Sequence, residues 1–198
     1  KELLTRFLRL AVFNLEEEEV NDIIDAIKDW MDEDDETTNF GAEGSYYQSL
    51  DRPYSCRNAS FGSLEELLLV KGVTAELFYG TEGNLGISSY LTVQGDGKIN
   101  INTADPLVLE ALSEDLDTTM INEMEEYRNN DKNELDKIDW YKTALGTSED
   151  FIDPALITIK SSYFEITSTG IRDTGIKGIK SIVRRSGKTF IALSWKTF

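Results

Sequence analysis

The chain has 198 residues, enough for one domain or two small ones with hydrophobic cores of their own. Its 37 Asp and Glu residues outnumber 20 Lys and Arg, so the formal net charge is −17. That balance disfavours nucleic acid and anionic membrane surfaces as partners, and it suits calcium or a basic protein surface. The absence of histidine excludes His-based catalytic triads and His zinc ligands. The single Cys56 cannot form an internal disulfide, and we interpret it as inert because no His can activate it.

The first 31 residues carry two apolar stripes at helical spacing. The first predicts a helix over residues 3 to 13. Asn14 is then expected to cap a second helix, with Glu17 three residues later completing a capping box. The second stripe predicts the buried face of that helix, made of Val20, Ile23, Ile24, Ile27, Trp30 and Met31.

An acidic stretch follows this helix and packs carboxylates more densely than a solvated turn requires. Counting from Asp32 as position 1 of a twelve-residue calcium loop, carboxylates fall at positions 1, 3, 5 and 12, which are Asp32, Asp34, Glu36 and Glu43. Thr38 at position 7 would offer its backbone carbonyl. Hard cations bind six to eight oxygens, and alternate residues of a tight turn direct oxygens to one centre. The spacing therefore predicts a Ca²⁺ site formed by these five residues.

Two features depart from that calcium-loop pattern. Thr37 stands at position 6, where an EF-hand has Gly for its sharp turn, and no exit helix is expected after Tyr47. The alternative interpretation of the stretch is an acidic surface loop without a metal ion.

The middle of the chain contains short helices separated by irregular segments. Ser63 and Glu66 form a capping box for a helix over Leu64 to Val70, which Gly72 ends. Thr74 is expected to cap a short helix that reaches Phe78. The glycine-rich residues 80 to 97 indicate a loop, within which a strand at Leu91–Val93 is considered.

The next segment returns to helices after a short strand at Ile99–Ile101. Asp105-Pro106 predicts a helix start, because proline fits the first helical position, and the helix continues to Leu112. Asp117 or Thr118 is expected to cap a longer helix through Arg128. A further short helix is predicted near Ile138–Leu145.

From Ile157 to the end, the sequence changes to β-branched and aromatic patterns typical of strands. Ser186-Gly187 is expected to form a two-residue hairpin turn. The predicted strands are Ile157–Ile159, Tyr163–Thr169, Gly178–Arg185 and Lys188–Trp195. Helices first and strands last indicate an α+β fold, with a helical body and a small C-terminal antiparallel sheet. This tail is also basic, and it could dock on the acidic body or on a partner.

A weak internal repeat raises a different function. Residues 63 to 73 and 101 to 112 each open a pair of short helices and resemble helix-hairpin-helix units, whose turn amides bind phosphate in nucleic-acid-binding proteins. The first copy keeps Val70-Lys71-Gly72-Val73, whereas the second has Ser113-Glu114-Asp115, whose acids would repel a phosphate. A structural use of the motif is favoured, and nucleic-acid binding is the alternative function. A glycosidase using two of the clustered carboxylates is a weaker alternative.

Several short signatures, in order along nearly the whole chain, resemble the minor pseudopilin K family of the bacterial type II (general) secretion system. They are Asp29-Trp30 with Asp32 and Asp34, Gly41-Ala42-Glu43, Tyr46-Tyr47, Pro53-Tyr54, Asn58, Leu64-Glu65-Glu66-Leu67-Leu68, Val70-Lys71-Gly72, Ile99-Asn100-Ile101-Asn102-Thr103-Ala104 and Ser162-Tyr163-Phe164. The Ile99–Ala104 run is the most specific of these pieces. Gly44 departs from the family, which usually has an acid at that position.

The resemblance implies a pseudopilin-type sheet combined with a helical domain of two SAM-like subdomains. On this basis we expect a first helical subdomain with the acidic loop at residues 1–98, a second at 99–155 and the strands at 156–198. It also implies calcium binding by the helical domain, where Asp32, Asp34 and Glu43 match the family's acidic loop. Asp29 matches as well and is expected to cap or hydrogen-bond near the loop.

The same resemblance implies a binding and assembly protein without enzymatic activity. Its expected partners are the minor pseudopilins I and J at the tip of the pseudopilus, with secreted substrate proteins considered as further partners and nucleic acid excluded. Its expected location is the periplasm, with an inner-membrane anchor in the full-length protein. No apolar run here approaches the roughly 20 residues of a membrane-spanning helix. We therefore interpret the sequence as a fragment that lacks the N-terminal helix.

Overall fold

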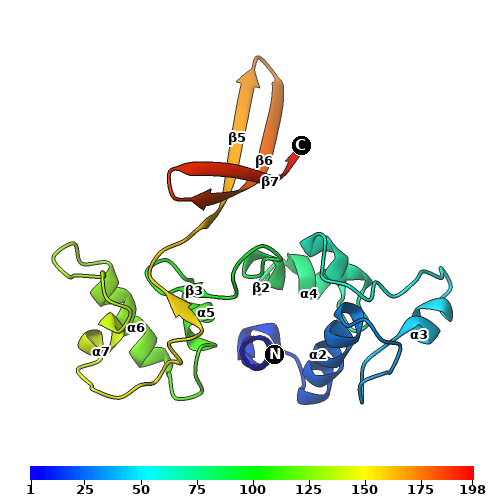
Figure 1. Ribbon diagram of the computed structural model, residues 1–198, viewed down its shortest axis with the longest axis horizontal. Helices are drawn as coiled ribbons and strands as arrows, with labels where there is room; N and C mark the ends of the chain where they lie inside the picture. The colour runs from blue at the N-terminus through cyan, green and yellow to red at the C-terminus, as the bar shows by residue number, and fades with distance from the viewer.

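The computed structural model describes residues 1–198 and has a wide helical body with a small sheet standing on it (Figure 1). The body has two halves side by side, and α1 lies between them. The expected mixture of helices with a small C-terminal antiparallel sheet is confirmed. None of the helices is both long enough and apolar enough to cross a bilayer.

The first half of the body begins with α1, the 3₁₀ helix η1 and α2. They span Glu2–Leu8, Ala11–Phe13 and Glu17–Met31. The prediction that Asn14 caps the second helix is wrong. Asn14 adopts a left-handed conformation (φ 49°) that ends η1, a conformation that asparagine tolerates better than most residues. Glu16 is the N-cap instead, and its backbone N–H donates to Glu19 Oε2 at 2.9 Å.

The remaining elements of this half are short. They are α3 (Gly44–Gln48), η2 (Leu64–Leu69), α4 (Ala75–Tyr79), β1 (Gly80–Thr81), β2 (Asn84–Leu85) and η3 (Ile87–Ser89). The Ser63–Glu66 capping box and the Thr74 cap are both confirmed. No strand forms at Leu91–Val93, and the only extended pairing nearby is the β1–β2 hairpin. A core of 17 buried residues, from Phe7 to Ala111, joins these elements to α1 and α2.

The second half has a separate core of 10 buried residues between Ile101 and Ile157. Its elements are β3 (Ile99–Asn100), α5 (Pro106–Glu110), α6 (Thr118–Arg128), α7 (Trp140–Ala144) and β4 (Ile157–Thr158). The Asp105 and Asp117 caps are confirmed by their bonds to the backbone N–H groups of Leu107 and Met120. β3 and β4 pair in parallel, so Ile157 contributes to this core.

Two arginines hold these elements together through main-chain carbonyls. Arg6 of α1 donates to the carbonyls of Ala111 and Leu112, at 2.8 and 2.9 Å, and so links the two halves. Arg128 of α6 donates to the carbonyl of Ala104 at 2.6 Å, which fixes the segment after β3. Carbonyls bonded by a guanidinium stay satisfied where no regular secondary structure can pair them.

The sheet has the strand order β5-β6-β7, all antiparallel. Its strands are Tyr163–Arg172, Gly175–Ser186 and Thr189–Thr197. Ser186 pairs with Thr189, so the two-residue turn is Gly187-Lys188, one residue later than predicted. Gly187 has the positive φ (61°) that such hairpin turns require. Lys196 Nζ forms an ion pair with Glu65 Oε1 of η2 at 2.7 Å, which joins the sheet to the body.

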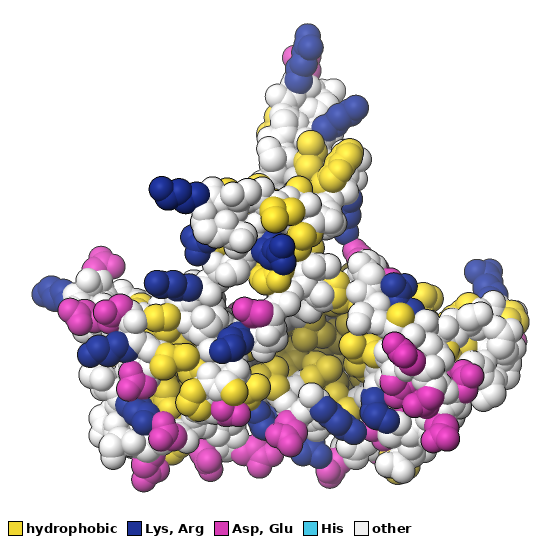
Figure 2. Space-filling model, viewed as in Figure 1, with side chains coloured by type: hydrophobic (Ala, Val, Ile, Leu, Met, Phe, Trp, Pro, Cys, Tyr) yellow, Lys and Arg dark blue, Asp and Glu magenta, His cyan; other side chains and the backbone are white.

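Charge is divided between these two parts (Figure 2). Lys and Arg side chains project from the sheet, and Asp and Glu side chains are spread over the helical body. The expected division of the chain at residues 98/99 and 155/156 stays a prediction.

Gly72, after η2, provides a test of how that turn packs on α2. It has φ +84°, and a Cβ there would lie 2.9 Å from Ile23 Cγ1. We expect Gly72→Ala to lower the free energy of unfolding by about 1–2 kcal/mol for the left-handed backbone alone, and by more because of the Ile23 overlap. Gly83→Ala is the matched control, since it has φ +96° with nothing within 4 Å. Equal losses in urea denaturation of the two variants would contradict the packing of the turn on Ile23.

Candidate metal centre

The acidic loop starts where α2 stops. The Asp32 N–H still donates to the carbonyl of Lys28 at 3.0 Å, but Asp32 itself is extended (φ −78°, ψ 170°), so the chain leaves the helix there. Glu43, at the far end of the loop, is the N-cap residue of α3. Helix ends thus fix both ends of the loop, and this brings oxygen atoms of Asp32, Asp34 and Glu43 within 4.8 Å of one another.

Asp34 is exposed, but the burial of Glu43 and of Asp32 Oδ1 distinguishes the group from an acidic surface loop. Glu43 is only 2% exposed, and neither of its carboxylate oxygens has a hydrogen-bond partner. Asp32 Oδ1 is likewise buried without a partner, whereas Asp32 Oδ2 lies 3.6 Å from Lys28 Nζ. Buried charges are normally paired or bind a metal ion. The oxygen-only donor set is also the kind that Ca²⁺ prefers, so these residues fit a calcium ion.

Glu36 is not in this group of carboxylates, and the prediction that the Thr38 carbonyl is a ligand stays untested. The exposed Glu36 contributes its backbone N–H, which donates to Asp34 Oδ1 at 2.8 Å. The Thr38 carbonyl accepts from the Gly41 N–H, and its hydroxyl accepts from Lys28 Nζ at 2.6 Å. Both residues therefore shape the loop through bonds within it and with α2.

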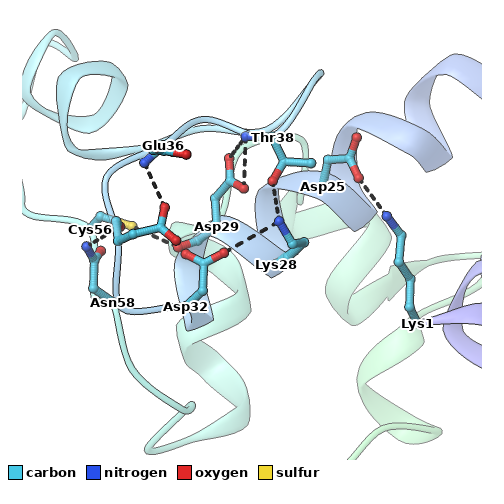
Figure 3. A network of polar contacts seen from close by, with 10 residues as sticks. Lys1, Asp25, Lys28, Asp29, Asp32, Glu36, Thr38, Cys56 and Asn58 are labelled. Carbon is cyan, nitrogen blue, oxygen red and sulfur yellow. Dashed lines mark hydrogen bonds and ion pairs between the residues drawn. The ribbon is translucent and has the colours of Figure 1, made fainter.

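Asp29, one turn back on α2, supports the loop from below (Figure 3). It is fully buried, and its two carboxylate oxygens accept from the Thr38 N–H at 3.0 and 3.2 Å. Gly41 packs directly on it, since a Cβ at Gly41 would overlap Asp29 Oδ2. The expected hydrogen-bonding role of Asp29 near the loop is confirmed.

Lys71, from the turn after η2, also bonds to the loop. Its Nζ donates to the carbonyl of Phe40 at 2.8 Å and lies 3.7 Å from Asp22 Oδ2. Its backbone N–H donates to the Tyr47 hydroxyl at 3.3 Å. The turn that a helix-hairpin-helix protein uses for phosphate therefore contacts the acidic loop here. Sequence reasoning missed this contact, because nothing in the local spacing links Lys71 to Phe40.

Electrostatics at the site follow from burial. Burial raises the pKa of the Glu43 carboxyl, the nearby Cys56 thiol opposes part of that rise as a weak donor, and the negative charges of Asp29, Asp32 and Asp35 raise the pKa further. Burial also raises the pKa of the neighbouring Cys56 thiol to about 11, so Cys56 is protonated at neutral pH. That thiol donates to the carbonyl of Asp29 at 3.7 Å, and the Glu43 oxygens have no hydrogen bond of good geometry.

Comparison with known proteins gives three findings. Residues 1–81 match the family model described as type II secretion system (T2SS), protein K. Over 100 residues, 49% of the chain, the sequence is 34% identical to type II secretion system protein K of Aeromonas hydrophila, and the match spans 28% of that protein. The whole chain also matches 69% of a chain in the crystal structure of the GspK-GspI-GspJ complex from the enterotoxigenic Escherichia coli type 2 secretion system. The TM-score is 0.76 at 18% identity, which establishes a shared fold.

Burial of the Glu43 carboxylate is expected to destabilise the fold in EDTA, by a free energy that depends on pH. The folded pKa of Glu43 lies above the ordinary value of 4.5, so the cost is absent below that pH and grows as pH rises through the folded pKa. At pH 7.5 we expect Glu43→Gln to raise stability by about 1 kcal/mol, or Tm by about 2–4 °C. The gain should shrink toward pH 4.5. Thermal melts across that pH range measure the effect. A Tm difference between the two proteins that is the same at every pH would contradict the burial of the charge.

The contact between Gly41 and Asp29 predicts a second effect on the loop. Gly41→Ala must displace the Asp29 carboxylate from the Thr38 N–H, and we expect a loss of about 1–3 kcal/mol in the free energy of unfolding. Gly44→Ala is the matched control in the same segment, because its Cβ would come no closer than 4.0 Å to Asp35 Oδ1. Urea denaturation of both variants measures the difference, and an unchanged Gly41→Ala protein would contradict the support role of Asp29.

Proposed function

We propose that this chain, which belongs to the type II secretion system protein K family, is a minor pseudopilin that caps the pseudopilus tip and carries a structural calcium site. The family consists of structural components of the secretion system and is not an enzyme family. In this proposal the chain assembles with minor pseudopilins I and J to support export of folded proteins across the outer membrane. It does so on the periplasmic side, anchored in the inner membrane as part of the full-length protein.

Family membership and fold support the assembly part of the proposal. The family model covers the half of the body that holds the acidic loop, and the related crystal structure is a complex of GspK with GspI and GspJ. The curated relative is much longer than the part of it that this chain matches, so partners and activity are proposed from the family. The two separate cores agree with two SAM-like subdomains in the helical body.

The calcium part depends on one observation, the fully buried Glu43 carboxylate without a hydrogen-bond donor. Asp32, Asp34 and Glu43 would hold the ion, and a bound Ca²⁺ would supply the positive charge that offsets these carboxylates. Asp29 and Lys71 orient the loop backbone through the Thr38 N–H and the Phe40 carbonyl. The chain's own residues thus hold the loop against α2, and the loop holds the shape of the body.

Nucleic-acid binding is not proposed. The Lys71 ammonium and amide are both occupied within the protein, and the second hairpin turn bonds internally from the Asp115 N–H to Ser113 Oγ at 3.2 Å. The acidic body would also repel a phosphate backbone. Catalysis by an acid pair is not proposed either, because the carboxylates that converge have metal-like spacing.

Calorimetric titration against the paired pseudopilins I and J, in calcium and again in EDTA, tests the proposal. We expect binding that is tighter in calcium, because the ion fixes the shape that is presented to the partners. Calcium at 100 times its Kd should also stabilise the chain by about 2.7 kcal/mol. Absence of binding in both conditions would contradict the assembly function. Equal binding in both conditions would mean that calcium contributes only to fold stability. A Tm that is the same in calcium and in EDTA would contradict the calcium site.

A further inference from the structure

Asn58 lies in an irregular segment between α3 and η2, yet its side chain is held firmly against the acidic loop (Figure 3). Its Nδ2 donates to the main-chain carbonyl of Asp34 at 2.8 Å and to Asp35 Oδ1 at 3.3 Å. The backbone of Asn58 is left-handed (φ 46°), a conformation that costs most residues free energy. Asparagine tolerates this conformation better than most residues, and here it directs the amide at the loop.

The other end of the amide has no partner. With Nδ2 bonded to the loop, Asn58 Oδ1 is buried and accepts no hydrogen bond. A buried acceptor without a donor destabilises a fold, and native proteins contain few of them. Six buried side-chain polar atoms in this structure are in that state; three are carboxylate oxygens of the acidic group, Asp32 Oδ1, Glu43 Oε1 and Glu43 Oε2, and a fourth is Asn58 Oδ1.

Asp34 connects Asn58 to the carboxylate group. Its carbonyl holds the Asn58 amide, and its carboxylate lies with those of Asp32 and Glu43 within 4.8 Å. Cys56, two residues before Asn58, lies beside Glu43, and its neutral thiol offers no positive charge to that carboxylate. The carboxylates supply three negative charges, and Asn58 adds a neutral carbonyl oxygen. Calcium sites commonly combine these two ligand types.

We propose that Asn58 is a neutral oxygen ligand of the calcium ion, supplied from outside the twelve-residue loop. This inference rests on the proposed function for the ion itself. Through Asn58, the ion joins the segment after α3 to the end of α2. Tyr54 in that segment packs on Trp30 and Tyr47, with ring centroids 6.2 and 5.3 Å apart, so ion binding is coupled to the aromatic core of the first half.

Substitution of Asn58 by Gly gives the sharpest test, because glycine accepts the left-handed backbone and removes only the amide. We expect calorimetry with Ca²⁺ alone to give a Kd at least tenfold weaker for Asn58→Gly. The calcium-induced change in Trp30 fluorescence should shift to the same higher concentrations. Asn14→Gly is the matched control, since Asn14 has the same left-handed conformation (φ 49°) away from the loop. That variant should bind calcium as the unsubstituted protein does.

A second variant separates metal ligation from hydrogen bonding. Asn58→Asp keeps an oxygen for the ion but loses the donor to the Asp34 carbonyl and adds a charge beside Asp35. It should melt at lower temperature in EDTA yet retain calcium binding. If Asn58→Asp loses calcium as completely as Asn58→Gly, the amide acts through its hydrogen bonds and the inference is wrong. An unchanged Kd in Asn58→Gly would overturn it as well. Absence of calcium binding by the unsubstituted chain would instead overturn the proposed metal site.

Discussion

A buried carboxylate without a hydrogen-bond donor, that of Glu43, is the constraint on which the first half of this protein depends. Its side chain is enclosed between the end of α2 and the start of α3. A charge in that position needs a counter-charge, since a buried unpaired ion is costly. The bonds around it position the loop backbone, and none of them neutralises Glu43. The proposed calcium ion would supply that counter-charge.

The helical body and the sheet are stabilised in different ways. Each half of the body has an apolar core of its own, and Arg6 links the halves through main-chain carbonyls. The sheet, by contrast, exposes large apolar side chains such as Ile171, Trp195 and Phe198. Its contact with the first half of the body includes one exposed ion pair, Lys196 with Glu65, and such pairs contribute little stability. The body presents mostly acidic side chains, and the basic sheet stands beyond it (Figure 2).

Local rules predicted most elements but failed where two of them competed. Thr74, Asp105 and Asp117 cap helices as their spacing indicates, because a cap depends only on residues two or three positions away. Asn14 satisfies both a cap pattern and a left-handed turn, and the turn prevails because η1 has to end there. The predicted turn, Ser186-Gly187, lies one residue before the observed turn, Gly187-Lys188. The pairing register of the two strands decides which two residues form the turn, and local spacing does not fix that register.

The sequence by itself determined the α+β order of elements, the acidic loop after α2 and three of its converging carboxylates, Asp32, Asp34 and Glu43. These follow from periodicity and spacing within a dozen residues. Only the tertiary structure decided which oxygens are buried and which residues from elsewhere complete the loop. Asn58 reaches Asp34 across 24 positions and Lys71 reaches Phe40 across 31. Contacts at such separations depend on how the cores pack, and local spacing carries no record of that packing.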